Sequence, residues 1–106
     1  MVDVQAEWVT FVPGGRRRVA IDGDKLMLVQ VEFDKGTVVA AHSHPHEQAT
    51  YIMSGQVEFT VSGSVQILNA GQSIHIPSNE LHGVVAQEAS TLLDVFSPPR
   101  EDFRPA

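Results

Sequence analysis

The chain has 106 residues, no cysteine and a formal net charge of −6 at pH 7. This length suffices for one compact core, so we expect a single domain over residues 1–106. The lack of cysteine excludes disulfides and thiolate metal sites, and the negative charge argues against nucleic acids and anionic membranes as partners. Residues 1–15 show no basic stretch followed by an apolar one, which predicts a cytoplasmic protein.

Three consecutive arginines, Arg16, Arg17 and Arg18, form the only basic cluster of the chain. A small anionic ligand would need such a positive feature. Adjacent arginines in a strand or turn are, however, usually a solvated edge. We therefore expect all three side chains to lie in solvent.

Short alternating segments separated by turn residues follow along the chain. Residues 28–33 (LVQVEF) and 56–61 (QVEFTV) alternate apolar and polar side chains, as a strand with one buried face does. Glycine, proline and asparagine recur between such segments, and no helical periodicity is left. The pattern predicts an all-β sandwich or barrel. We expect strands at 28–33, 37–44, 49–54, 56–62, 65–68, 73–76, 83–87 and 91–96.

The stretch HSHPHEQ at 42–48 contains three histidines, a glutamate and a glutamine. Residues two apart on a strand share a face, so His42 and His44 should point the same way. The proline after them breaks the strand, and a turn there would bring Gln48 back beside both histidines. A single histidine is more often a hydrogen-bonded residue than a ligand. The pair, followed by His82 after a proline-marked turn, favours a metal site.

These residues resemble the two sequence motifs of the cupin family. The first motif, within 36–55, has glutamine at Gln48 where the family usually has glutamate; its matching residues are Gly36, His42, His44, Gln48 and Gly55. The second, within 71–86, has Asn79 in place of the usual glycine and Ala86 where asparagine is common; it matches at Gly71, Pro77 and His82. The resemblance implies a single-domain cupin, a jelly-roll barrel (double-stranded β-helix) with one divalent metal in its mouth.

Carried over by position, the resemblance assigns the metal to His42, His44, Gln48 and His82. Glu47 is the rival of Gln48, but it is one residue off the family spacing and is expected on the opposite face of the strand. Three neutral imidazoles and a neutral amide would leave the charge of the metal uncompensated, so the site would attract an anion. Nickel, zinc, manganese, iron and copper all suit such donors. The remaining histidines, His46 and His75, match no ligand position, and we expect both to be structural.

The C-terminal stretch LLDVFSPPREDF at 92–103 puts Leu92, Asp94 and Phe96 on one face of a strand. A carboxylate between apolar residues is costly if it is buried without a partner, so a place at a strand end or sheet edge is an alternative. With the histidine motifs, this tail resembles the small cupins called pectin degradation proteins. That group converts 4,5-unsaturated monouronates from pectin and alginate into linear keto sugar acids. Its activity is tied to the residues that match Asp94, Phe96 and Arg100.

The resemblance therefore implies an isomerase-like enzyme that opens the ring of a small anionic sugar acid. Asp94 would act as the general acid/base, Arg100 would bind the substrate carboxylate, and Phe96 would form an apolar wall. Two alternatives stay open: a cupin that binds a sugar acid without catalysis, and an iron-dependent dioxygenase. A homodimer is also expected, because an exposed N-terminal strand can pair across a twofold axis.

Overall fold

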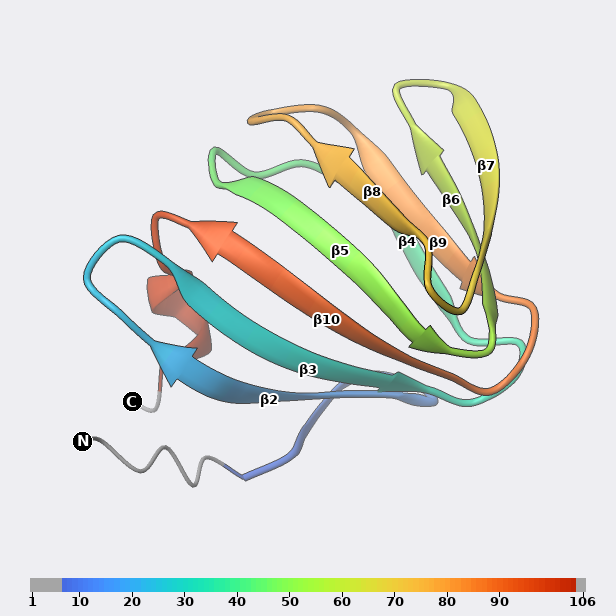
Figure 1. Cartoon of the computed structure of the whole chain (residues 1–106), viewed down its shortest axis with the longest axis horizontal. Helices are drawn as coiled ribbons and strands as arrows, with labels where there is room; N and C mark the ends of the chain where they lie inside the picture. The colour runs from blue at the N-terminus through green and yellow to red at the C-terminus, as the bar shows by residue number, and fades with distance from the viewer. Residues whose placement is uncertain (1–6, 105–106) are drawn as a thin grey trace.

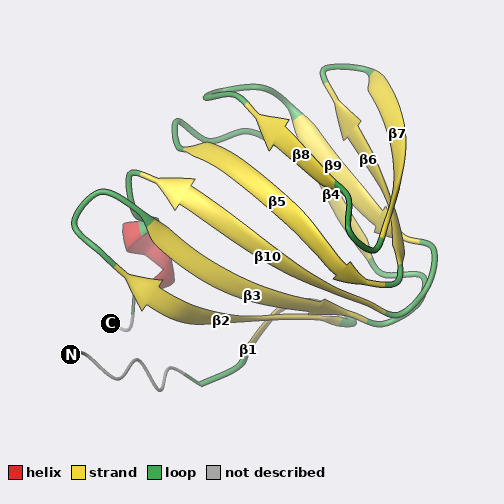
Figure 2. Ribbon diagram, in the orientation of Figure 1, coloured by secondary structure: helices red, strands yellow, loops and turns green. Residues whose placement is uncertain are grey.

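The computed structural model describes residues 7–104, most of which lie in β-strands (Figure 1 and Figure 2). Within that range no helix is long and apolar enough to cross a membrane. The only helix described is the short 3₁₀ helix η1 (Glu101–Phe103). The strands are β1 (Val9–Val12), β2 (Gly15–Asp22), β3 (Met27–Phe33), β4 (Val38–His42), β5 (Glu47–Ser54), β6 (Gln56–Val61), β7 (Ser64–Asn69), β8 (Ser73–Ile76), β9 (His82–Ala86) and β10 (Ser90–Ser97).

The strands form two antiparallel sheets. One sheet has the order β1-β2-β3-β10-β5-β8, and the other has the order β4-β9-β6-β7. In Figure 1 the first sheet runs across the lower left and centre, and the second lies at the upper right. Two packed antiparallel sheets of this kind form a jelly roll, so the predicted all-β fold class is confirmed.

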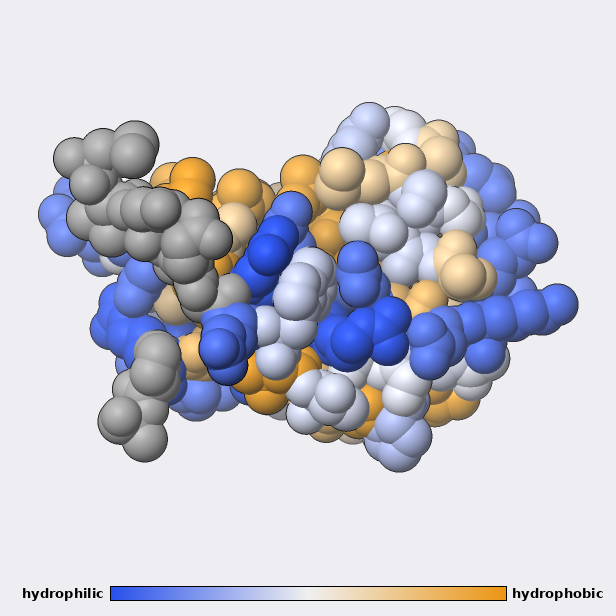
Figure 3. All heavy atoms as spheres, turned by 90° about the horizontal axis from the view of Figure 1, so that it is seen from below, coloured by the Kyte–Doolittle hydropathy of each residue, from blue (hydrophilic) through white to orange (hydrophobic). Residues whose placement is uncertain are grey.

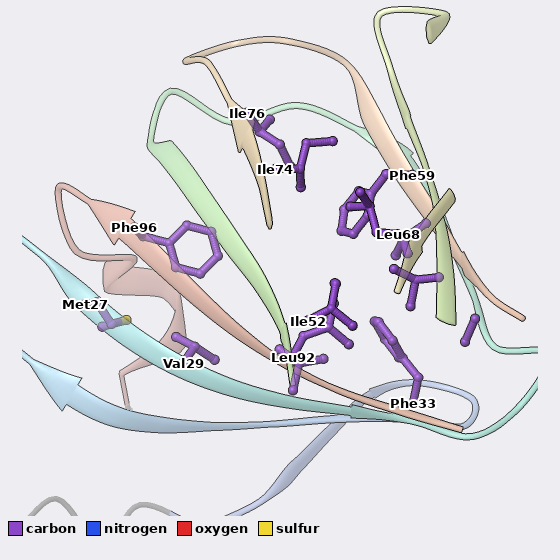
Figure 4. Packing of buried hydrophobic residues seen from close by; sticks show 14 of the residues in the cluster. Met27, Val29, Phe33, Ile52, Phe59, Leu68, Ile74, Ile76, Leu92 and Phe96 are labelled. Carbon is purple, nitrogen blue, oxygen red and sulfur yellow. The ribbon is translucent and has the colours of Figure 1, made fainter. Parts of the chain in front are cut away.

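The core lies between the sheets and is built by alternation along each strand. In β3, Val29, Val31 and Phe33 are buried while the residues between them are partly exposed, as the sequence pattern predicts. Figure 4 shows Val29 and Phe96 pointing inward from the six-stranded sheet, with side chains such as Phe59 of the other sheet further along the same interior. Each fully buried aliphatic or aromatic side chain contributes roughly 1.5–3 kcal/mol of transfer free energy.

The strand ranges expected from the alternation begin at residue 28 and do not include β1 or β2, which form a hairpin across Pro13 and Gly14. Gly14 has a φ of +80°, a conformation that glycine adopts without strain. The three arginines mask the alternation of β2, so its pattern does not read as a half-buried strand. The pairing of β2 with β3, in which Arg17 lies opposite Val31, makes it a strand nonetheless.

The expected strand at 37–44 ends earlier than predicted, at His42. Its partner β9 begins at His82, directly opposite His42, so no β9 residue remains to pair with His44. His44 therefore lies in the loop after β4. The argument that His42 and His44 share one face of a strand is wrong, although the two side chains do meet.

The outward face of β2 is polar. Arg16 contacts Glu32 and Asp34, at 3.4 and 3.3 Å between nitrogen and oxygen. Arg18 donates to the side-chain oxygen of Gln30 at 2.6 Å. Viewed from below in Figure 3, hydrophilic residues cover the middle of the surface, and the hydrophobic patches are separate from one another. All three arginines are partly exposed. The solvated edge expected from the cluster is found for Arg16 and Arg18, which contact polar side chains on the outward face.

Candidate metal centre

A cavity of about 340 Å³ lies between the two sheets. Side chains of β3 and β10 form much of its apolar wall, which suits a small organic ligand. Its polar and charged lining comes from both sheets and from the C-terminal segment. These polar residues are Arg17, His42, Gln48, His82, Asp94, Arg100 and Asp102.

The three histidines His42, His44 and His82 converge at this cavity. The ring centre of His82 lies 4.5 Å from that of His42 and 4.8 Å from that of His44. One ligand nitrogen from each residue lies within 4.8 Å of the others. Three imidazoles at this spacing can bind one metal ion.

Backbone carbonyls orient the three imidazoles. The Nδ1 atoms of His42, His44 and His82 lie 3.0, 3.0 and 2.9 Å from carbonyl oxygens, those of residues 40, 46 and 80. Such a contact fixes the proton on Nδ1 and leaves the lone pair of Nε2 free for a metal. Burial, with a smaller contribution from the charge of Arg100, lowers the pKa of His44 to about 4. Burial also lowers the pKa of His82, so both rings are neutral near pH 7.

Gln48 lies beside His44, with its Oε1 3.1 Å from His44 Nε2. Its amide group donates to Thr50 Oγ1 at 2.9 Å, and the Thr50 hydroxyl donates to Asp94 Oδ1 at 2.6 Å. This chain of hydrogen bonds turns the amide oxygen toward His44. Neither that oxygen nor Nε2 then carries a proton, so two lone pairs face each other. A cation would satisfy both, and the donor set therefore fits a divalent metal.

The rival ligand Glu47 is exposed on the other face of β5. Its Oε2 lies 2.6 Å from Nε2 of His75, which is itself exposed between the buried Ile74 and Ile76. Both residues thus point away from the cavity, as the alternation predicts. His46 is buried, and its carbonyl oxygen receives the Nδ1 proton of His44.

Asn79 stabilises the loop that carries His44. Its backbone N–H donates to the carbonyl oxygen of His44 at 2.8 Å. Asn79 has a φ of +66°, in the left-handed region that favours glycine and that asparagine tolerates best among the other residues. The replacement of the usual cupin glycine by Asn79 therefore keeps the local backbone conformation.

Asp94 lies in the middle of β10, opposite Val29 of β3 and Thr50 of β5. Because β10 lies inside its sheet, the alternative of a strand end or sheet edge is wrong. Burial raises the pKa of Asp94 to about 6, although hydrogen bonds from Thr50 and Gln48 and the charge of Arg100 act in the opposite direction. A carboxyl group with this pKa can both accept and donate a proton near pH 7.

Phe96 and Arg100 meet near the C-terminus. The buried Phe96 ring packs against His44 and Phe103, each at 5.7 Å between ring centres. The guanidinium carbon of Arg100 lies 5.1 Å from the centre of the Phe96 ring. Arg100 also donates from Nε and Nη2 to the two carboxylate oxygens of Asp102, at 3.1 and 3.0 Å. The sequence did not predict this partner.

The sequence did not predict a site role for Arg17, Asp102 and Phe103, which line the cavity, or for Thr50, which contacts Asp94. Thr50 could have been found, because it lies two residues after Gln48 and so shares its strand face. Asp102 and Phe103 follow the last strand, and their positions depend on the turn of η1. Arg17 was expected in solvent, but alternation along β2 points it inward, so this expectation is wrong.

Comparison with known proteins agrees with this geometry. Residues 29–96 match the family described as Cupin domain, and the chain belongs to the cupin family. Within that family it is 38% identical over 104 residues to the pectin degradation protein KdgF of Dickeya dadantii (strain 3937). That match covers 96% of this chain and 94% of the relative.

Two solved structures are similar over nearly the full length. The crystal structure of an RmlC-like cupin from Shewanella frigidimarina NCIMB 400 has a TM-score of 0.89 at 35% identity, covering 98% of this chain and 94% of that one. The structure of KdgF from Halomonas sp. has a TM-score of 0.89 at 33% identity, covering 97% and 96%. The cupin fold is thereby confirmed, and the chain is a relative of pectin degradation proteins.

Proposed function

We propose that this protein is a metal-dependent enzyme that converts 4,5-unsaturated monouronates from pectin or alginate into linear keto sugar acids. One observation carries the proposal: a cluster of three imidazoles lies at the cavity that also holds a carboxyl group with a pKa of about 6. The similarity to KdgF, over nearly the whole chain, supports the same conclusion. His42, His44, Gln48 and His82 would hold one divalent ion, of nickel, zinc, manganese, iron or copper.

The proposed reaction moves protons and breaks one bond of the ring. The substrate is an enol ether with a hemiacetal at C1. Breaking the bond between C1 and the ring oxygen, with loss of the C1 hydroxyl proton, gives an aldehyde. The ring oxygen becomes the ketone oxygen at C5, and a proton is added at C4. Proton loss and gain balance, so no redox cofactor is needed.

Asp94 would carry the proton from the C1 hydroxyl to C4. Thr50 donates a hydrogen bond to Oδ1 of Asp94 and holds the carboxyl group in place for proton exchange. A bound divalent cation supplies Lewis acidity, which stabilises negative charge on the substrate oxygens. Phe96 would form an apolar wall against the sugar ring.

Arg100 would bind the substrate carboxylate while it keeps its contact with Asp102. A guanidinium group has five N–H donors, and Asp102 uses those on one side of the fork, at Nε and Nη2. The remaining hydrogens on Nη1 and Nη2 form a second fork that suits a carboxylate. Asp102 would thus fix the orientation of Arg100 for the substrate.

The test is to mix the purified protein with an unsaturated monouronate and follow the enol-ether absorbance in the ultraviolet. We expect the absorbance to fall, to stay constant after treatment with a chelator, and to fall again once a divalent metal is added. Binding of the uronate without any loss of absorbance would instead indicate a sugar-acid-binding cupin. Consumption of dissolved oxygen during the reaction would indicate a dioxygenase.

We further propose that the protein acts as a cytoplasmic homodimer. The support for the dimer is that, among residues 7–104, β1 is an edge strand of the six-stranded sheet, and an edge strand can pair with a second copy. Light scattering in solution measures the mass directly, and a monomer mass would contradict the dimer.

A further inference from the structure

Arg17 differs from both of its arginine neighbours. Arg16 and Arg18 point outward from β2 and contact side chains of β3 and Asp34. Arg17 lies opposite the buried Val31 and lines the cavity. Alternation along β2 therefore places the cationic side chain of Arg17 at the candidate site.

The surroundings of Arg17 leave its hydrogen-bond donors free. Its guanidinium carbon lies 4.0 Å from the centre of the Phe103 ring and 5.3 Å from that of Phe11. Burial is the largest effect on Arg17 and lowers its pKa, and the charges of Asp102 and Arg100 act on it in opposite directions. Among residues 7–104 the Arg17 side chain has no hydrogen-bond or ion-pair partner. Aromatic rings contact the faces of a guanidinium group but do not satisfy its N–H donors.

The charges at this side of the cavity do not balance. Arg100 and Arg17 both lie over the Phe103 ring, at 4.2 and 4.0 Å, and Asp102 is bound to Arg100 alone. Asp94 also lies at the cavity, but its carboxyl group is hydrogen-bonded to Thr50. Among residues 7–104, Arg17 is therefore a cation at the cavity with no carboxylate in contact with it. A carboxylate placed near both guanidinium groups would supply the missing anion and would accept the N–H groups of Arg17.

We propose that Arg17 is a second substrate-binding residue, which together with Arg100 binds the carboxylate of an acidic sugar. The sugar-acid substrate rests on the proposed function, whereas the carboxylate site rests on the two arginines alone. Selection of uronates over neutral sugars would then depend on a cation from β2 as well as on one from the C-terminal segment.

The first experiment compares the kinetics of two variants. Arg17→Met removes the charge but keeps an unbranched apolar side chain at this position, and Arg18→Met removes the same charge from the outward face of the same strand. We expect Arg17→Met to raise KM about tenfold to a hundredfold, as loss of a charge-assisted hydrogen bond does, with kcat almost unchanged. Arg18→Met should leave KM as in the parent. Equal KM values for all three proteins would overturn the proposal, as would a lower melting temperature of Arg17→Met with an unchanged KM.

A second experiment measures binding without any reaction, so it tests the role of Arg17 independently of the proposed ring-opening activity. Calorimetry compares binding of glucuronate, which lacks the reactive double bond, with binding of its neutral amide. The parent protein should prefer glucuronate, and Arg17→Met should lose most of that preference. Arg17→Lys keeps a charge but not the fork, so its preference for glucuronate should lie between that of the parent and that of Arg17→Met. It is also the variant to test if Arg17→Met does not fold. A preference that survives in Arg17→Met and Arg17→Lys, or none in the parent, would overturn the proposal. A parent that prefers glucuronate through Arg17 but does not open unsaturated uronates would contradict the proposed function only.

Discussion

Asp94→Asn should lower activity and raise stability at the same time. Asparagine has nearly the same shape and can still accept the hydrogen bond from Thr50, but it cannot carry a proton. If Asp94 is the general acid/base, the rate of ring opening should fall by roughly 10²–10⁴. Metal content should not change, because Asp94 is outside the proposed ligand set.

The gain in stability follows from the pKa of Asp94. Burial raises it from 3.8 to about 6 in the folded state. Above pH 6 the carboxylate is ionised in both states, and folding carries the full cost of burying the charge. A shift of about two pH units, at about 1.4 kcal/mol per unit, corresponds to roughly 3 kcal/mol. Below pH 3.8 both states are protonated, and this cost disappears.

Denaturant unfolding of the metal-free proteins measures this difference. We expect Asp94→Asn to be more stable than the parent at pH 7 by an amount on the order of 2–3 kcal/mol, and the difference to shrink as the pH falls below 6 and to vanish below pH 3.8. Titration of the buried histidines changes the free energy of unfolding of both proteins equally, so it cancels in the difference. An unchanged rate would refute the acid/base role. Equal stability at pH 7, or a difference that persists at low pH, would refute the explanation by burial.

Other changes test the metal centre and the fold. His82→Ala should lose the metal and the activity while the protein stays folded; full occupancy by elemental analysis would remove His82 from the ligand set. Gln48→Glu should keep the metal and lower the activity, because the added negative charge reduces the Lewis acidity; a rate at the parent level would contradict this. Gly55→Ala should destabilise the protein by more than about 1 kcal/mol in denaturant unfolding, because φ is +88° and a Cβ would collide with Ser90 and the carbonyl oxygen of Ala89. Gly63→Ala, with a φ of +83° and open space around it, is the matched control and should cost less.

The sequence allowed prediction of the parts of the fold that depend on alternation. β3 and β6 show a regular period of two. β3 buries the side chains that the pattern selects, and β6 buries Val57 and Phe59 and partly buries Val61. β2 does not show it, because three arginines occupy positions on both faces. Whether an arginine in a strand lies in solvent or in a cavity depends on the neighbouring strand. The pairing of β2 with β3 is a tertiary property that no local pattern contains.

The candidate ligands were predicted by spacing, although part of the geometric reason was different. His42 and His82 meet because β4 and β9 place them directly opposite each other. His44 meets them from a loop, held by a hydrogen bond from Asn79 that the spacing alone does not predict. The contact between Arg100 and Asp102 was missed for a related reason. It depends on the turn of η1 after the double proline, where no periodic pattern remains.

The positions of the candidate ligands relative to the two sheets have a mechanical consequence. His42 and His82 belong to the four-stranded sheet, Gln48 belongs to the six-stranded sheet, and His44 lies on the connection between them. A cation bound by all four would cross-link the two layers at one end of the sandwich. Separation of the sheets would then require release of the ion, so the melting temperature should rise with the concentration of free metal. The same bonds between the ion and its four ligands would then serve both the reaction at the site and the attachment of one sheet to the other.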